Sequence, residues 1–107
     1  MLNFTSFIHH FFHALSKVWS ILAGLIAWLV INAAAIAYYE NISFADALYF
    51  TFITGLTIGY GDISPETFAG RIVAIMTGVL GILITGLVVA IAVYALRKTM
   101  EASADGH

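Results

Sequence analysis

The sequence predicts an all-α membrane protein with two transmembrane helices, and two observations support this fold class. The first is composition: 62% of the 107 residues are hydrophobic and only 9% are charged, whereas about a quarter of the residues in a soluble domain carry charge. The second is the spacing of the charges, which leaves residues 18–39 and 72–96 without any. At about 1.5 Å per residue these runs reach roughly 33 and 37 Å, enough to cross a hydrocarbon core of about 30 Å.

The rest of the composition excludes several classes of protein. The length permits one small domain, and the absence of cysteine rules out a disulfide scaffold or a cysteine-ligated metal site. A net charge of −2 provides no basic stripe for a nucleic-acid backbone, so we expect no nucleic-acid partner. We expect neither a cofactor nor enzyme activity, because His9, His10 and His13 have no carboxylate or nucleophile on the same helical turn.

The first uncharged run has two interpretations. Ala33, Ala34 and Ala35 resemble the cleavage site of a secretory signal. Against this, the run is long, contains Trp28, and follows seventeen residues with one lysine rather than a short basic leader. We therefore interpret it as a membrane-spanning helix.

Charge asymmetry predicts how the two spans are oriented. Lys17, Arg97 and Lys98 flank the outer ends of the spans, whereas acidic residues outnumber the single Arg71 between them. By the positive-inside rule both termini lie in the cytoplasm. We expect the protein in the plasma membrane, which it would cross twice.

Residues 1–17 precede the first span and are expected to form an amphipathic helix at the cytoplasmic leaflet. Apolar residues recur at helical spacing on one side of residues 2–16, with Ser6 and three histidines on the other. His9 and His13, one turn apart, have a metal-binding or proton-sensing interpretation. They also have a plainer one, as solvated side chains on the wet face.

Residues 40–64, between the spans, carry the signals of a helix and a return loop. Ser43 with Asp46 three positions later predicts a capped helix start. A helix over residues 44–56 would descend roughly 18 to 20 Å, and the next five residues, if extended, would climb back about 17 Å. The segment can thus dip into the bilayer and return. A cap, a proline and an acid then predict a second helix start: Ser64, Pro65 and Glu66.

The returning residues form a hexapeptide, Thr57, Ile58, Gly59, Tyr60, Gly61 and Asp62. Backbone that is neither helix nor closed barrel lies at membrane depth only where protein buries it or where it lines a water-filled path. The hexapeptide resembles the selectivity filter of potassium channels, with Ile58 in place of the usual valine. The order of span, re-entrant pore helix and filter, and span resembles the prokaryotic two-transmembrane-helix potassium channel pore, of the proton-gated bacterial type. The resemblance covers residues 18–98 and implies a passive, K⁺-selective channel.

The chemistry of K⁺ binding explains these residue types. Successive carbonyl oxygens must point to one side to replace the water around the ion, and Gly59 and Gly61 can adopt the left-handed dihedrals this requires without a Cβ penalty. The filter is expected at Thr57, Ile58, Gly59, Tyr60 and Gly61, with K⁺ held at the first four. We expect Asp62 at the outer mouth, and Tyr60 packed on Tyr49 and Phe50.

One chain supplies only one side of such a cage. Four copies around a four-fold axis would enclose it, so we expect a homotetramer, as the resemblance also implies. Each descending helix would then direct the partial negative charge of its C-terminus toward a central cavity. The expected partners are other copies of this chain, membrane lipid, and K⁺ as the permeant ion.

The second span, expected as an inner helix over residues 65–98, is unusually rich in glycine. A helical glycine costs roughly 1 kcal/mol relative to alanine, so close packing or a hinge should justify it. The resemblance implies a gating hinge, which matches Gly81, with Gly86 as a second small position. At Gly81 packing is an equal alternative.

A stripe of residues one turn apart on this helix is expected to face the aqueous path: Thr85, Val89 and Val93. Spacing and analogy with the family place Thr85 in the cavity. A ring of Val89 or Val93 side chains from four chains would close the pore by dewetting.

Two departures limit what the resemblance implies about gating. Ile53 stands where the proton-gated relative has a glutamate behind the filter, so no carboxyl there can pair with Asp62. The expected cytoplasmic tail, residues 99–107, is too short for a nucleotide- or Ca²⁺-binding gating ring, and neither span has the repeated arginines of a voltage sensor. A proton gate would depend on the three N-terminal histidines with Glu101 and Asp105.

The predicted organisation is therefore an N-terminal helix (1–17), a pore domain (18–98) with outer helix 18–39, pore loop 40–64 and inner helix 65–98, and a tail (99–107). Three alternatives stay open. The chain could be a less selective cation pore, the isolated pore of a longer receptor-gated channel, or a small membrane adaptor whose loops bind a partner.

Overall fold

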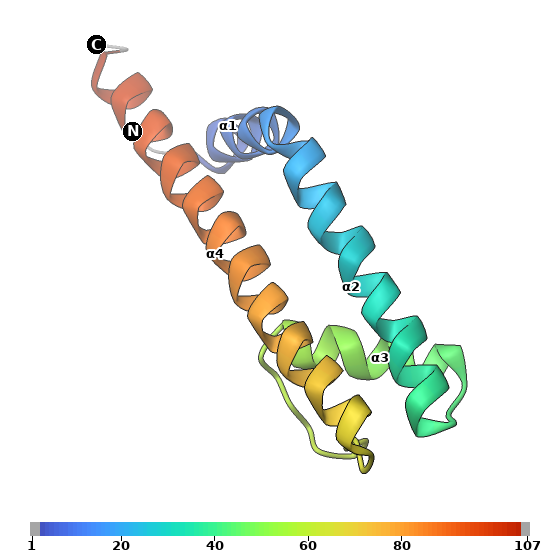
Figure 1. Cartoon of the computed structure of the whole chain (residues 1–107). Coiled ribbons are helices and arrows are strands. Elements are labelled where there is room, and N and C mark those ends of the chain that lie inside the picture. The colour runs from blue at the N-terminus through green and yellow to red at the C-terminus, as the bar shows by residue number, and fades with distance from the viewer. Residues whose placement is uncertain (1–2, 106–107) are drawn as a thin grey trace. The chain divides into compact units, whose positions relative to one another are not determined.

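The computed structural model describes residues 3–105, with side chains described through residue 104. Four helices follow one another along the chain, α1 (Phe4–Lys17), α2 (Trp19–Glu40), α3 (Phe44–Gly55) and α4 (Phe68–Asp105) (Figure 1). This part of the chain contains no strand, which confirms the all-α fold class. By length and composition, α2 and α4 are the two helices able to cross a membrane.

The predicted N-terminal helix is present as α1. Its N-cap is Asn3, whose side-chain oxygen accepts a hydrogen bond from the Ser6 N–H at 2.6 Å. Leu2, where the helix was expected to begin, lies outside the described residues. Lys17 occupies the last turn, where a cation is favoured by the helix dipole. Ala14 is buried and His9 is exposed, but Phe4 and Phe12 are exposed as well, so the amphipathic, interfacial character of this helix stays a prediction.

The described residues divide into two compact units. One comprises the chain up to Leu22 and from Gly86 onward, and so contains α1 and the C-terminal part of α4. The other is Ala23–Thr85, which contains most of α2, all of α3 and the N-terminal part of α4.

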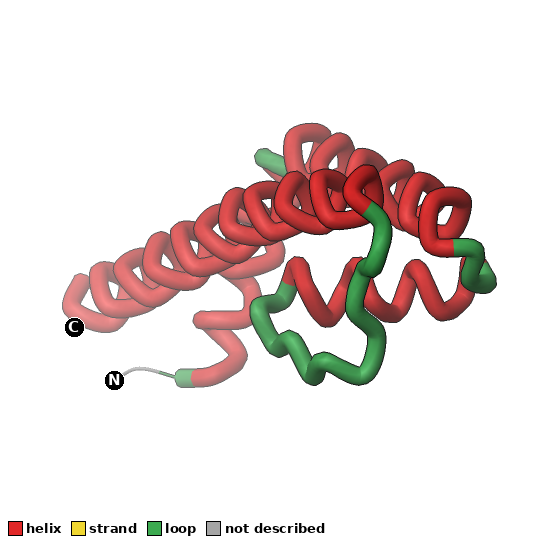
Figure 2. Tube along the Cα trace, turned by 60° about the horizontal axis from the view of Figure 1, so that its bottom comes forward, coloured by secondary structure: helices red, strands yellow, loops and turns green. Residues whose placement is uncertain are grey.

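The Ala23–Thr85 unit is organised around α3. Its core joins Ile36 of α2 to Ala47 and Phe50 of α3, and Val73 of α4 packs against this cluster. Residues 56–67 return from the end of α3 to the start of α4 as a loop, drawn in green in Figure 2. Apolar contact with both long helices thus holds α3 in place, and the return loop starts from a fixed point.

A buried polar contact also joins the two long helices of this unit. The side-chain amide of Asn32 on α2 donates to the Thr77 hydroxyl on α4 at 3.2 Å, and that hydroxyl donates to the Val73 carbonyl at 2.9 Å. Asn32 is 5% exposed and Thr77 is fully buried. Because an unpaired polar group is costly in hydrocarbon, this contact favours one alignment of α2 and α4.

The start of α4 differs from the prediction. Ser64, Pro65 and Glu66 remain in the loop, and the helix begins at Phe68. The cap is Thr67, whose hydroxyl accepts from the Gly70 N–H at 2.9 Å. The predicted cap at Ser64 is therefore wrong, because the three-residue spacing of cap and bonded N–H is satisfied three positions later.

The end of α4 also differs from the prediction. The helix continues to Asp105, through residues 99–105 that were expected to form a tail. Lys98 and Glu101 form an ion pair at 3.6 Å, and the Thr99 hydroxyl donates to the Ala95 carbonyl at 2.8 Å. No glycine or proline occurs between Lys98 and Gly106, so nothing in this stretch interrupts the helix after the last apolar turn.

Candidate functional site

The segment α3 positions the hexapeptide and begins as the sequence predicts. The Asp46 N–H donates to the Ser43 hydroxyl at 3.1 Å, and the helix ends at Gly55 with Leu56 as its C-cap. Four N–H groups of residues 56–59 donate to the last carbonyls of α3, including Ile58 N to Ile53 O at 2.9 Å. The start of the hexapeptide is therefore bonded directly to the helix end.

The backbone of the hexapeptide shows the predicted left-handed glycines. Gly59 has φ +59° and Gly61 has φ +81°. A Cβ added at either position would meet nothing within 4 Å in a single chain. The requirement for glycine is therefore conformational and does not come from lack of space.

Thr57 also has a positive φ, +63°, which the sequence did not predict. Left-handed backbone is unfavourable for a β-branched residue and occurs mainly at functional sites, where the surroundings enforce it. The Thr57 hydroxyl donates to the Leu56 carbonyl at 2.6 Å, and the Thr57 N–H donates to the Thr54 carbonyl at 3.1 Å. Three left-handed residues at alternate positions thus run through this loop.

The expected packing of Tyr60 on Tyr49 and Phe50 is not seen within one chain. Tyr60 is 67% exposed, and Phe50 is buried in the core beside Ile36. Phe50 is turned toward α2 because it lies on the apolar face that α3 shares with that helix. The hexapeptide is exposed throughout, from Thr57 to Asp62.

The Tyr49 side chain instead reaches Asp62. Its hydroxyl donates to Asp62 Oδ2 at 2.9 Å, which ties the outer end of the hexapeptide to α3. This hydrogen bond is the main reason that the pKa of Tyr49 lies above its usual value. Ile53 offers Asp62 no carboxyl, and the partner seen is a phenol thirteen residues before Asp62. Sequence reasoning missed this pair because only the tertiary fold brings α3 alongside the returning chain.

Glu40 has a structural role that sequence reasoning also missed. Its carboxylate accepts from the backbone N–H of Glu66 at 2.7 Å and of Thr67 at 3.1 Å, and from the Thr67 hydroxyl. A Cβ at Gly70 would collide with the same carboxylate. The last residue of α2 therefore caps the N-terminal end of α4, where the helix dipole favours a negative charge.

The two glycines proposed as hinges have different surroundings. A Cβ at Gly81 would collide with the Gly55 carbonyl oxygen and lie 2.5 Å from the Gly55 Cα. The backbones of α3 and α4 therefore meet at this point, which supports the packing interpretation of Gly81. A Cβ at Gly86 would meet nothing within 4 Å. Within the described residues α4 is one uninterrupted helix, and its hinge remains a proposal.

The other predicted residues belong to α1 and α4. The predicted pore-lining residues Thr85, Val89 and Val93 are all exposed on α4. This exposure is consistent with a stripe that faces away from the core of the single chain. His9 and His13 stack with their ring centroids 6.4 Å apart. Over residues 3–104 no three histidine or carboxylate side chains gather into a metal-binding cluster. Glu101 pairs with Lys98, and the Asp105 side chain lies outside the described residues.

Residues 23–98 match the sequence profile of the family described as "Ion channel", a match that covers α3, the hexapeptide and most of both long helices. The chain is 41% identical over 81 residues to the rat "Intermediate conductance calcium-activated potassium channel protein 4", an alignment that covers 76% of this chain. It is 37% identical over 75 residues to the Drosophila melanogaster "Open rectifier potassium channel protein 1", covering 61% of this chain. A Caenorhabditis elegans "Small conductance calcium-activated potassium channel-like protein 3" is 42% identical over 52 residues, covering 49% of this chain.

These relatives are much longer proteins, since the alignments cover 18% of the rat channel and 8% of each of the other two. All three are animal channels rather than enzymes, and the comparisons do not single out the proton-gated bacterial type. The profile match covers more than half of the chain and coincides with the span, pore helix, loop and span seen here. The chain therefore belongs to the ion channel family and has the potassium channel pore fold.

Proposed function

We propose that this chain forms a passive K⁺-selective channel as a cyclic homotetramer. The observation that carries the proposal is the hexapeptide Thr57–Asp62, which leaves the end of a short helix with left-handed backbone at Thr57, Gly59 and Gly61. Left-handed residues at alternate positions turn successive carbonyls toward one side of the chain, whereas the carbonyls of a regular strand alternate. A row of oxygens on one side is what a dehydrated K⁺ requires.

The exposure of the hexapeptide supports assembly into a tetramer. Ile58 and Tyr60 are 47% and 67% exposed in one chain, although backbone of this kind is tolerated at membrane depth only when it is covered or lines a water path. Three further copies around a four-fold axis would cover these side chains and complete the ring of oxygens. The α3 helices of the four chains would then converge on the axis with their C-terminal ends inward.

The gate is proposed on the inner side of the same pore. Four copies of the exposed stripe Thr85, Val89 and Val93 would line the path below the filter, and a valine ring would close it by dewetting. Bending at Gly86, where an added side chain would meet nothing, is the simplest way to move this ring. We propose further that both termini lie in the cytoplasm and that the membrane is the plasma membrane; the positive charges of Lys17, Arg97 and Lys98 support this orientation.

Potassium selectivity is supported by the names of the three relatives, each of which is described as a potassium channel. The names of the relatives also mention calcium activation and rectification, but this chain covers less than a fifth of the length of those proteins. We propose only the conduction of K⁺ for this chain, without their stimuli.

The proposal is tested by reconstituting the purified full chain in lipid vesicles and measuring reversal potentials in mixed K⁺ and Na⁺. The expected result is a reversal potential close to that of K⁺. Gly59→Ala should abolish the preference for K⁺ without preventing membrane insertion, because alanine at φ +59° is strained. Gly78→Ala is the matched control, since an added Cβ there meets nothing within 4 Å and its φ is helical.

Two results would refute the proposal in different ways. Vesicles that conduct no ion would favour a membrane adaptor, and vesicles that conduct K⁺ and Na⁺ equally would favour a non-selective cation pore. Chemical cross-linking in native-like lipid tests the assembly separately. It should produce species up to a tetramer, and a monomer alone would refute the closed ring.

A further inference from the structure

The three histidines of α1 are metal-ligating side chains that the proposed channel does not use. His9 and His13 are exposed, and His10 is half-buried. The rings of His9 and His13 lie nearly parallel, with an angle of 9° between their planes and their centroids 6.4 Å apart. The His10 ring instead meets the His9 ring edge-on, at 67° and 5.4 Å. The structure therefore singles out His9 and His13 as a pair on one side of the helix.

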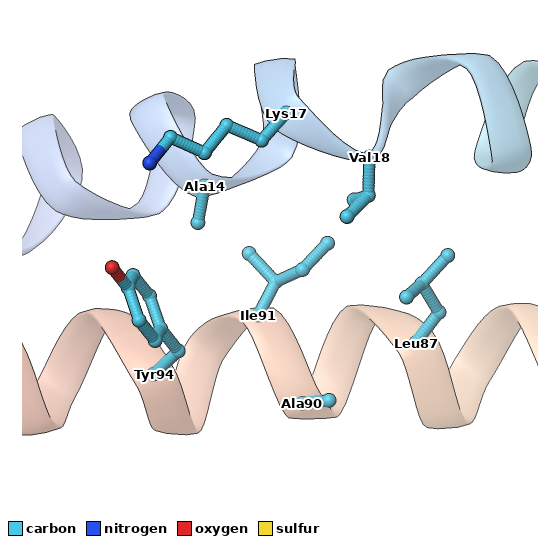
Figure 3. Close-up of a pocket in the computed structure, with 7 residues that line it drawn as sticks. All are labelled: Ala14, Lys17, Val18, Leu87, Ala90, Ile91 and Tyr94. Carbon is cyan, nitrogen blue, oxygen red and sulfur yellow. The ribbon is translucent and has the colours of Figure 1, made fainter.

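The helix that carries this pair is fixed by contacts that leave both rings accessible. A helix of 14 residues is marginal on its own in water. The Asn3 side chain caps its start, and the buried Ala14 lines the space between α1 and α4, where Figure 3 shows its side chain directed toward Ile91. These contacts hold the four-residue spacing of His9 and His13 in helical form.

The distance between the two rings is close to that of a chelate. Side chains four residues apart lie on one face of a helix, and this spacing is the one by which a helix presents two imidazoles to a zinc ion. With a Zn–N bond of about 2.0 Å and a ring nitrogen about 1.2 Å from its centroid, two imidazoles at the tetrahedral angle have centroids roughly 5.2 Å apart. Rotating χ1 of His9 and of His13 by roughly 15° each would close the gap, which is well within one rotamer.

The chemistry of the pair favours a late first-row transition ion. Imidazole suits Zn²⁺, Cu²⁺ and Ni²⁺, whereas Mg²⁺ and Ca²⁺ require oxygen ligands. The sequence of α1 contains no carboxylate, and over residues 3–104 no third histidine or carboxylate joins the pair in a metal-binding group. Lys17, four residues after His13, adds positive charge, which disfavours an ion held by charge alone.

We propose that His9 and His13 of α1 together bind one late first-row divalent transition ion, with water in the remaining coordination positions. One ring nitrogen of each histidine would donate its lone pair to the ion, and each ring binds in its neutral form. The ion would join two successive turns of α1. This function is separate from ion conduction, because the pair lies outside the hexapeptide and the proposed gate.

The proposal is tested by isothermal titration calorimetry of the full chain in detergent micelles. Zn²⁺, Cu²⁺ and Ca²⁺ are used as separate probes, and any polyhistidine tag is removed first because it would bind the same transition ions. We expect one Zn²⁺ per chain, tighter binding of Cu²⁺ than of Zn²⁺, and no Ca²⁺ binding that depends on His9.

Variants with matched controls test the ligands and their spacing. His9→Gln and His13→Gln should each abolish Zn²⁺ binding, because one imidazole alone does not chelate. His10→Gln removes the neighbouring imidazole and should retain binding, as should His107→Gln, which removes the fourth histidine of the chain. Thr5 is exposed and lies four residues before His9, so Thr5→His combined with His13→Gln should restore binding.

Electron paramagnetic resonance of bound Cu²⁺ provides a second readout, because nitrogen couplings count the coordinated imidazoles. We expect two imidazoles in the wild-type chain and one in His9→Gln or His13→Gln.

Three outcomes would overturn the proposal. An equal loss of Zn²⁺ binding in His10→Gln and His13→Gln would show that the ion does not select the pair. One Zn²⁺ per two chains would place the site between copies of the chain. Failure of Thr5→His to restore binding would show that the helical spacing does not determine the site. None of these measurements requires the protein to conduct, so their results are independent of the proposed K⁺ conduction.

Discussion

Replacing Gly81 with alanine tests whether this glycine serves helix packing. The added Cβ would lie 2.5 Å from the Gly55 Cα and 2.8 Å from the Gly55 carbonyl carbon. Both atoms belong to the backbone of α3, which cannot rotate away as the end of a flexible side chain can. The substitution therefore requires α3 and α4 to move apart by roughly 1 Å, which would disturb interior packing that normally leaves few voids.

The expected magnitude follows from two opposing terms. Overpacking of this kind costs about 3 kcal/mol at the upper end of the observed range. Alanine regains about 1 kcal/mol of helix propensity relative to glycine. We therefore expect Gly81→Ala to destabilise the fold by about 2 kcal/mol.

The measurement is an unfolding titration of the purified chain in mixed micelles, followed by circular dichroism. Gly78→Ala serves as the control for helix propensity, because its Cβ meets nothing within 4 Å, and it should be neutral or slightly stabilising. Gly55→Ala should be tolerated far better than Gly81→Ala. Its Cβ would lie 3.6 Å from a Leu29 methyl and 3.8 Å from the Gly81 Cα, both ordinary contacts.

The reasoning is refuted if Gly81→Ala is as stable as Gly78→Ala. If the stability is unchanged while K⁺ flux through the reconstituted protein falls, Gly81 acts as a hinge. A loss of stability with flux per folded channel unchanged would establish the packing role alone.

Three further substitutions test contacts that hold the pore together. Tyr49→Phe removes the donor to Asp62, so we expect the K⁺ flux through the reconstituted protein to decline with time severalfold faster than in the wild type. The pKa of Tyr49 is raised by this hydrogen bond. In the wild type the contact should therefore persist from neutral pH to above the usual tyrosine pKa of about 10 and be lost only at higher pH. Glu40→Gln replaces the charged acceptor at the start of α4 and should lower the midpoint of the micelle unfolding titration. Thr77→Val leaves the Asn32 amide unpaired and should cost about 1 kcal/mol in that titration.

Each of these expectations has a control and a contradicting result. Tyr38→Phe alters a tyrosine that is 79% exposed and should leave flux unchanged, so a similar decline in both variants would remove any special role for Tyr49. Glu66→Gln should hardly change the unfolding midpoint, and equal shifts in the two glutamine variants would argue against capping by Glu40. Thr77→Ser keeps the hydroxyl, and a loss as large as that of the valine variant would show that the lost methyl, not the hydrogen bond, matters.

The sequence was sufficient for the features that depend on neighbouring residues. Charge-free runs identified both long helices, because an apolar span is set by the residues within it. Ser43 and Asp46 identified the start of α3 for the same reason, and Gly59 and Gly61 were correctly predicted to be left-handed. The local pattern was misleading at Ser64, because Thr67 is an equally good helix cap. Which of the two residues caps α4 depends on Glu40, which binds the backbone N–H groups of Glu66 and Thr67.

Tertiary structure decided the contacts between residues far apart in the chain. Glu40 meets the residues before α4 across 26 and 27 positions, and Asn32 meets Thr77 across 45. Each such meeting depends on where two helices cross, which no single segment specifies. The close approach of Gly55 and Gly81 belongs to the same class, because glycine at either position is equally consistent with a bend, a cap or a contact until the facing backbone is placed.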